Sequence, residues 1–223
     1  MGIKVLVVDD HKLLREAVRF RLHAEEGMDV VGEAENGRVA VHLARELNPD
    51  VIIMDVGLPN MNGVEATHQI LREQPGTKVI AFAGGLDRHS VQRMLAAGAS
   101  GYVLKSCSLE ELLAAIRDVM ENRTYLSSQV CAMVVDGYVS HSADSKCSMC
   151  PELTAREREV LQLITEGKST KMIAKELCLS GKTIDWHRSR IMKKLHIESI
   201  AGLVRYAMAE GLTSADLIPL AGL

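Results

Sequence analysis

Two short apolar runs that each end in aspartate set the architecture of this chain: Lys4-Val-Leu-Val-Val-Asp-Asp10 and Val51-Ile-Ile-Met-Asp55. Runs that are apolar at almost every position are typical of strands covered on both faces. Three further candidate strands lie at 29–34, 78–82 and 101–104. Each strand is followed by a segment with apolar residues at helical spacing, and this strict alternation predicts a parallel sheet with helices on both faces.

The first 125 residues are therefore predicted to form one α/β domain. Its fold class is a doubly wound, five-stranded parallel sheet with the flavodoxin-like strand order, in which the first and third strands are neighbours. The expected helices cover 13–24, 39–47, 64–72, 90–97 and 109–120.

The second half of the chain has only helical patterns. Thr154 and Glu157 have the spacing of a capping box, which predicts a helix start. We expect a small all-α domain of four helices over 151–223. The segment 126–150 is predicted to be a linker, because its later part is polar, rich in serine and without period, and a short helix over 128–138 leads into it.

Composition and charge narrow the function classes. The chain has 223 residues, 47% of them apolar and only 3% aromatic, which fits two packed domains and disfavours base-stacking RNA-binding modules. No apolar run approaches the roughly eighteen residues of a membrane span, and no signal peptide is evident, so we expect a cytoplasmic protein with no membrane partner. The net charge is −5 over 1–150 and +2 over 151–223, which suggests different partners for the two halves.

Four charged residues directly follow predicted strands. Asp9 and Asp10 follow the first strand, Asp55 the third and Lys105 the fifth. Because the carboxyl ends of parallel strands meet at one edge, we expect these side chains to converge. Three clustered carboxylates stay ionised only beside a cation, and an all-oxygen set of ligands suits Mg²⁺.

Three segments resemble the signatures of two-component receiver domains: Val7-Val-Asp-Asp10, Ile53-Met-Asp-Val-Gly-Leu-Pro-Asn-Met-Asn-Gly63 and Gly98-Ala-Ser-Gly-Tyr-Val-Leu-Lys105. The resemblance covers about residues 1–125. It implies that a histidine kinase is the partner and that the function is the acceptance of a phosphoryl group.

The resemblance also implies a role for each residue at the strand ends. Asp55 would accept the phosphoryl group, and Asp10 and Asp55 would bind Mg²⁺ directly. The Gly57 carbonyl would be a further ligand, Asp9 would act through water, and Lys105 would hold a phosphoryl oxygen. The charges fit these roles, because a carboxylate attacks an anionic phosphoryl group only when cations offset the repulsion.

One position departs from the family pattern. The family has Thr or Ser at the end of the fourth strand, where this chain has Ala83, and Tyr102 occupies the place of the switch aromatic. Two alternatives follow. Either Asp55 is phosphorylated and switching is blunted, or the receiver works largely independently of phosphorylation.

The third helix of the second half carries the candidate DNA-binding residues. Five basic residues and one acid lie between Lys182 and Lys194, while Ile184, His187, Ile191 and Leu195 recur on the core face. We expect Lys182, Arg188, Lys193 and Lys194 to contact phosphates. The residues expected nearer the base edges are Asp185, Trp186, Ser189 and Arg190, of which Arg190 suits guanine and Asp185 cytosine. An alternative for Trp186 is packing on sugars or on a thymine methyl, and Thr183 is a further candidate DNA contact.

Four segments of this half resemble the LuxR-type helix-turn-helix of NarL/FixJ response regulators: Leu153-Thr-Ala-Arg-Glu-Arg-Glu-Val-Leu161, Gly167-Lys-Ser169, Ile173-Ala-Lys-Glu-Leu177 and Lys182-Thr-Ile-Asp-Trp-His-Arg-Ser-Arg-Ile-Met-Lys-Lys-Leu195. The match spans about 151–212 and implies a transcription regulator that binds double-stranded DNA as a homodimer when active. RNA polymerase is a further candidate partner. The fourth helix offers Leu203, Ala207 and Leu212 to a core or to a partner, and the resemblance favours a dimer contact there.

Two other functions remain open at this point. The chain could be a phosphorelay or protein-binding receiver whose tail contacts a protein, or a Mg²⁺-dependent phosphatase using Asp9, Asp10 and Asp55. The phosphatase lacks a second nucleophile-and-acid pair and leaves the helical half unexplained, so we do not expect an enzyme. Cys147 and Cys150 have C-x-x-C spacing but are expected to be free thiols, since a structural zinc site needs four ligands.

Overall fold

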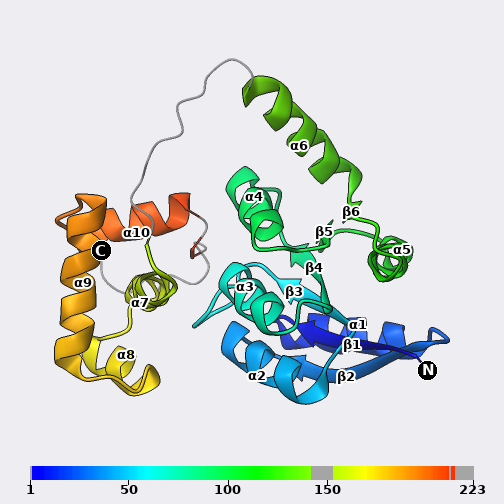
Figure 1. Ribbon diagram of the computed structural model, residues 1–223, viewed down its shortest axis with the longest axis horizontal. Coiled ribbons are helices and arrows are strands. Elements are labelled where there is room, and N and C mark those ends of the chain that lie inside the picture. Colours follow the sequence, from blue (N-terminus) through cyan, green and yellow to red (C-terminus); the bar gives the residue numbers. More distant parts are fainter. Residues whose placement is uncertain (1, 142–152, 211, 214–223) are drawn as a thin grey trace. The chain divides into compact units, whose positions relative to one another are not determined.

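The structure, a computed structural model, describes residues 2–141, 153–210, 212 and 213 (Figure 1). The chain divides into two compact units, Met1–Ser145 and Lys146–Leu223, and each is considered by itself. The C-x-x-C pair and most of its polar surroundings lie outside the described residues.

The first unit contains a six-stranded sheet in the order β2-β1-β3-β4-β5-β6, and every neighbouring pair is parallel (Figure 1). The order of the first five strands confirms the predicted flavodoxin-like arrangement. The strands are β1 (Ile3–Val8), β2 (Met28–Ala34), β3 (Val51–Asp55), β4 (Lys78–Ala83), β5 (Gly101–Leu104) and β6 (Tyr125–Leu126).

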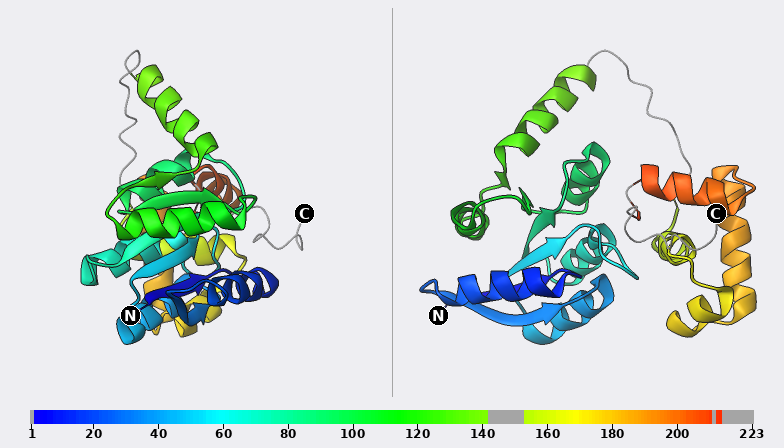
Figure 2. Two further views of the ribbon diagram at one scale, coloured as in Figure 1. Left: turned by 90° about the vertical axis from the view of Figure 1, so that its right-hand side faces the viewer. Right: turned by 180° about the vertical axis from the view of Figure 1, so that it is seen from behind.

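Helices cover both faces of the sheet, as Figure 2 shows. One apolar layer joins the sheet to α1 (Lys12–His23) and α5 (Leu109–Met120), and the other joins it to α2 (Gly37–Leu47), α3 (Gly63–Glu73) and α4 (Arg88–Ala96). Successive strand side chains alternate between the layers, so every position of β3 and β5 is buried. This explains why the strand runs are apolar throughout.

The sixth strand corrects the sequence prediction, whereas the helix after it confirms the helix predicted over 128–138. β6 pairs with β5, and α6 (Ser128–His141) follows it within the segment predicted as a linker. The Ser127 N–H donates to the Tyr102 carbonyl at 3.0 Å, and Val130 is fully buried against the sheet. A two-residue strand is too short to show a period, so the sequence carried no signal for it. That the rest of the segment is a linker stays a prediction.

The second unit consists of four helices, as expected. They are α7 (Ala155–Thr165), α8 (Thr170–Glu176), α9 (Gly181–Leu195) and α10 (Ile200–Ala209). The predicted capping box begins α7, since Glu157 Oε2 accepts from the Thr154 N–H at 2.8 Å and the Glu157 N–H donates to Thr154 Oγ1 at 3.3 Å. The helix begins where the sequence placed it.

Helix α10 packs its apolar side inward. Leu203, Ala207 and Leu212 are all buried in the core of this unit, with at most 3% of any of them exposed. They are therefore core residues, and that α10 makes a dimer contact stays a prediction. Among the described residues, no helix combines the length and apolar character that a bilayer crossing requires.

The close approach of α3 to β3 yields a stability prediction. A Cβ on Gly63 would lie 2.1 Å from the Asp55 carbonyl oxygen, whereas a Cβ on Gly84 would meet no atom within 4 Å. Gly63→Ala should lower the free energy of unfolding of the first unit by about 2 kcal/mol, because the backbone at Gly63 or Asp55 must move to make room for the methyl group. Gly84→Ala should leave it unchanged within about 0.5 kcal/mol. Urea unfolding followed by circular dichroism checks both, and equal stability of the two variants would contradict the prediction.

Candidate functional site

The acidic rim lies at the carboxyl edge of the central strands. Val8 of β1 pairs with Met54 of β3, so Asp9 and Asp55 leave neighbouring strands side by side. Lys105 follows β5, and its N–H donates to the Ala83 carbonyl at 2.8 Å, which places it across β4 from Asp55. The structure thus brings to one place residues that lie far apart in the sequence.

Lys105 bridges the two buried carboxylates. Its Nζ lies 2.7 Å from Asp9 Oδ2 and 2.9 Å from Asp55 Oδ2. The side chains of Asp9 and Asp55 are only 2% and 6% exposed, and that of Lys105 is 16% exposed. Because water hardly reaches these groups, each charge depends on the others.

The pKa values follow from this arrangement. Burial raises the pKa of Asp55, Lys105 works in the opposite direction, and the nearby charge of Asp9 raises it further. Burial works against the charge of Lys105, but attraction to Asp55 and Asp9 outweighs this and raises the pKa of Lys105. The lysine therefore stays charged, and Asp55 is less stable as an anion than a solvated aspartate.

His11 is a member of the rim that the sequence analysis did not include. Its Nδ1 lies 2.7 Å from Asp10 Oδ1 and 3.2 Å from Asp9 Oδ1, and its N–H donates to Asp9 Oδ1 at 2.8 Å. Its position directly after the two aspartates was the available signal. One ligand atom from each of Asp9, Asp10, His11 and Asp55 lies within 4.8 Å of the others.

The turn after β3 completes the rim. The Gly57 N–H donates to Asp55 Oδ1 at 3.2 Å, so one oxygen of Asp55 contacts the turn and the other contacts Lys105. That the Gly57 carbonyl is a metal ligand stays a prediction.

Ala83 and Tyr102 are both inside the first unit. Ala83 ends β4 and is 4% exposed, so no hydroxyl stands at this edge of the strand. The Tyr102 ring is fully buried, and its hydroxyl has no hydrogen-bond partner. Burial raises the pKa of Tyr102, and Asp87 and Asp55 add to the shift. An unsatisfied buried hydroxyl costs about 1–3 kcal/mol. In Tyr102 no hydrogen bond of the hydroxyl offsets this cost.

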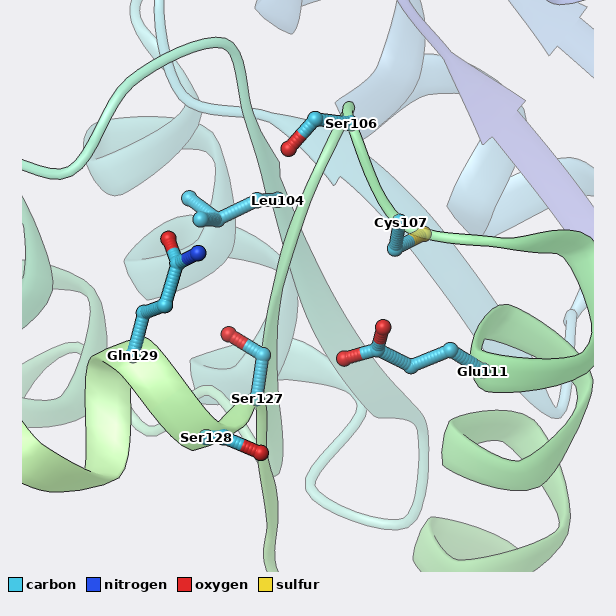
Figure 3. Close-up of a pocket in the computed structure, with 7 residues that line it drawn as sticks. All are labelled: Leu104, Ser106, Cys107, Glu111, Ser127, Ser128 and Gln129. Carbon is cyan, nitrogen blue, oxygen red and sulfur yellow. The ribbon is translucent and has the colours of Figure 1, made fainter.

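A separate hollow of about 170 Å³ lies beside the loop that follows Lys105 (Figure 3). Ser106 and Cys107 of that loop line it together with Glu111 of α5, Ser127 and the first residues of α6. None of the clustered acids lines this hollow. It shows that β6 brings the start of α6 next to the loop carrying Lys105.

The third helix of the second unit, α9, presents most of the predicted DNA-binding residues at its surface. Ile184 and Ile191 are buried as expected, while His187 and Leu195 are only half-buried. The residues classed as exposed are Lys182, Asp185, Trp186, Ser189, Arg190 and Lys193, and those that are half-buried are Thr183, Arg188 and Lys194.

A buried carboxylate holds two of these cations within the unit. Glu157, whose side chain is 2% exposed, lies 2.6 Å from Lys194 Nζ and 3.3 Å from Arg190 Nε. Burial works against its charge, but Lys194 and Thr154 outweigh this and hold the pKa of Glu157 below its ordinary value. The sequence analysis missed this role because Glu157 and Lys194 are 37 residues apart.

Comparisons with known proteins agree with both units. Residues 5–117 match the family described as response regulator receiver domain, and residues 151–207 match the family described as bacterial regulatory proteins, luxR family. The chain is 38% identical over 213 residues to the response regulator GacA of Pseudomonas aeruginosa, covering 96% of this chain and 99% of GacA. It is 38% identical over 205 residues to the transcriptional regulatory protein LiaR of Bacillus subtilis, covering 92% and 96%.

The fold is also found among solved structures. RcsB from Salmonella enterica serovar Typhimurium, bound to the promoter rprA in the presence of the phosphomimetic BeF3-, matches with a TM-score of 0.59 and 25% identity over 92% of this chain and 98% of RcsB. The chain belongs to the response regulators that join a receiver domain to a luxR-family helix-turn-helix. It is thus a DNA-binding transcription regulator of a two-component system.

The buried ion pair of Glu157 yields a pH-dependent prediction. Glu157→Gln should lower the free energy of unfolding of the second unit by about 2 kcal/mol at pH 7, because it removes the buried negative charge that pairs with Lys194 and Arg190. A carboxylate with a lowered pKa stabilises the fold above its unfolded pKa, and this contribution is lost as the pH falls through the folded value. The cost should therefore shrink as the pH falls below the unfolded value of about 4.3.

Urea unfolding followed by tryptophan emission measures the free energy of unfolding of the second unit, since Trp186 is the only tryptophan of the chain and lies in that unit. Glu198→Gln, at an exposed position, is the matched control and should change stability by less than about 0.5 kcal/mol. A cost that stays constant from pH 7 to pH 3 would show that Glu157 acts through packing alone.

Proposed function

We propose that this response regulator is switched by transfer of a phosphoryl group to Asp55, with Mg²⁺ bound at the acidic rim and a histidine kinase as donor. The observation that carries the proposal is the buried Asp55 carboxylate, held 2.9 Å from Lys105 beside a second buried carboxylate, Asp9. A carboxylate whose pKa is raised by burial is a poorly solvated anion, and this favours nucleophilic attack.

In this proposal a carboxylate oxygen of Asp55 forms the new bond to phosphorus, and the bond from phosphorus to the imidazole nitrogen of the kinase breaks. Lys105 is already between Asp9 and Asp55, so its ammonium group is close enough to bind an incoming phosphoryl oxygen. The Gly57 N–H keeps one oxygen of Asp55 oriented. No second nucleophile is required.

The rim suits a divalent cation. Asp9, Asp10 and Asp55 supply carboxylate oxygens, and the ligand atoms of the cluster lie within 4.8 Å of one another. Oxygen ligands of this kind are the ones that Mg²⁺ prefers. We assign Asp10 and Asp55 as direct ligands, with the Gly57 carbonyl as a third and Asp9 acting through water. The ion would supply positive charge that offsets the repulsion between the carboxylates and the phosphoryl oxygens.

A second candidate is a receiver that works independently of phosphorylation, and Tyr102 favours it. In this chain the Tyr102 ring is fully buried, next to a strand that ends in Ala83. A ring that is already buried cannot move further inward when Asp55 is phosphorylated. Its position would then be the same with and without the phosphoryl group. The blunted switch and the independent receiver differ in one measurable respect, the effect of phosphorylation on DNA binding.

For output, we propose that α9 enters the major groove of double-stranded DNA and that two copies bind two half-sites about one helical turn apart. The exposed cations Lys182 and Lys193 on α9 support phosphate contacts. The RcsB structure was determined on a promoter with a phosphomimetic, which supports the same linkage of rim and helix here. Contact with RNA polymerase and a cytoplasmic location complete the proposal.

Phosphorylation is tested by mass. Incubation with acetyl phosphate and Mg²⁺ should add one phosphoryl group to the wild type and none to Asp55→Asn, because the nucleophile is lost. Asp29→Asn, a substitution at an exposed aspartate of β2, should be labelled like the wild type. Intact-protein mass spectrometry reads the result, and an unlabelled wild type would leave only the phosphorylation-independent receiver.

DNA binding is tested by its salt dependence. The full chain should be retained on duplex DNA with a log–log salt slope of several units, and Lys182→Ala should reduce that slope by about one, since one phosphate contact is removed. Arg205→Met, at an exposed position of α10, removes the same charge from the same unit and should not change the slope. Adding beryllofluoride with Mg²⁺ should strengthen binding if the switch is merely blunted and leave it unchanged if the receiver is independent.

A further inference from the structure

The exposed tryptophan of α9 is the least expected surface residue of the second unit. Trp186 is the only tryptophan of the chain, and 53% of it is exposed. An isolated large apolar side chain is common at a surface, but this one has structured surroundings. The His187 ring packs edge-on against it with the centroids 5.0 Å apart, and the Arg190 guanidinium lies over the indole at 4.9 Å.

Arg190 is engaged on two sides. The face of its guanidinium lies over Trp186, and its Nε lies 3.3 Å from Glu157 Oε1. Glu157 is itself fixed by Thr154 and Lys194 and is 2% exposed. Reading a guanine through Nε would require Arg190 to leave the buried carboxylate, and that movement would also change its contact with the ring. These contacts indicate that Arg190 sets the position of the indole.

The position of Trp186 on α9 places it at the centre of the outward face. At 100° per residue, Lys182, Trp186 and Lys193 fall within an arc of about 40°, opposite the buried Ile184 and Ile191. The two lysines flank the indole along the helix. Asp185, exposed in the same turn, lies 3.3 Å from Arg188, so this turn combines an ion pair with the apolar indole.

We propose that Trp186 contacts the C5 methyl group of a thymine in the major groove, and that Arg190 is a positioning residue that holds the indole there instead of reading guanine itself. The thymine methyl is the apolar group that the major groove presents, and an aromatic side chain packs against it. The inference rests on the proposed binding of α9 to duplex DNA and adds which base is recognised, and by which side chain.

Binding-site selection from a pool of random duplexes tests the proposal with the full chain. The wild type should select a thymine at one position of the half-site, and Trp186→Ala and Arg190→Met should both lose that preference by about tenfold. Arg205→Met, which removes the same charge at an exposed position of α10, should keep it. If Arg190→Met instead relaxes a selected guanine that Trp186→Ala retains, Arg190 reads a base and the proposal is overturned.

A second pool with uracil in place of thymine tests the methyl group with unaltered protein. The wild type should lose its preference at that one position and keep the others, and an unchanged preference would overturn the proposal. Trp186 emission provides an independent readout, because added DNA should shift it and Arg190→Met should increase the mobility of the indole in the free protein. Selection of no site at all would remove the proposed function together with this inference, whereas selection without the thymine effect removes the inference alone.

Discussion

The contact of Lys105 with Asp9 and Asp55 is the interaction on which the receiver unit depends. Two carboxylates that water hardly reaches would repel one another at the end of β1 and β3, and one ammonium group between them makes the arrangement stable. The same contact keeps Asp55 ready to react, since Lys105 and the Gly57 N–H bind its carboxylate at a place where the side chain is only 6% exposed. Stability and reactivity at this edge therefore arise from the same three charges.

The DNA-binding unit uses a buried charge in a comparable way. Glu157 caps the start of α7 and also binds Lys194 and Arg190 of α9, so one carboxylate connects the first helix of the unit to its recognition helix. The two roles of Glu157, in joining the helices and in binding cations of α9, oppose each other. Its negative charge must be present for the helices to stay joined, but each cation that it binds is withdrawn from the positive surface offered to DNA.

Tyr102 shows how one small residue can alter a switch. Ala83 offers no hydroxyl at the end of β4, and the Tyr102 hydroxyl is buried without a partner. An inward ring whose polar end is unsatisfied is held by its apolar contacts alone, with Val91 and Met94 of α4 in the same buried cluster. The response of Tyr102 to phosphorylation then depends on side-chain packing. It does not depend on a hydrogen bond between Tyr102 and a hydroxyl at the end of β4.

Most of the architecture could be predicted from local patterns. The central strands, the helix bounds within a few residues, the capping box of α7 and the four charged groups at the strand ends follow from periodicity and from the rule that parallel strands end at one edge. β6 could not be predicted, because two residues show no period, and its strand identity comes only from pairing with β5. The inward side of α10 was likewise left open, since Leu203 and Ala207 suit a core and a partner equally well.

The sequence alone determined which residues carry charge and on which side of each helix they lie, because helical and strand periods are local properties. Only the tertiary structure decided which charges are paired. Lys105 on Asp9 and Asp55, and Arg190 and Lys194 on Glu157, are contacts between groups whose distance along the chain says nothing about their distance in space. The tertiary structure also decides which charges are buried. Burial strengthens these pairs, because a charge removed from water interacts mainly with its few fixed neighbours.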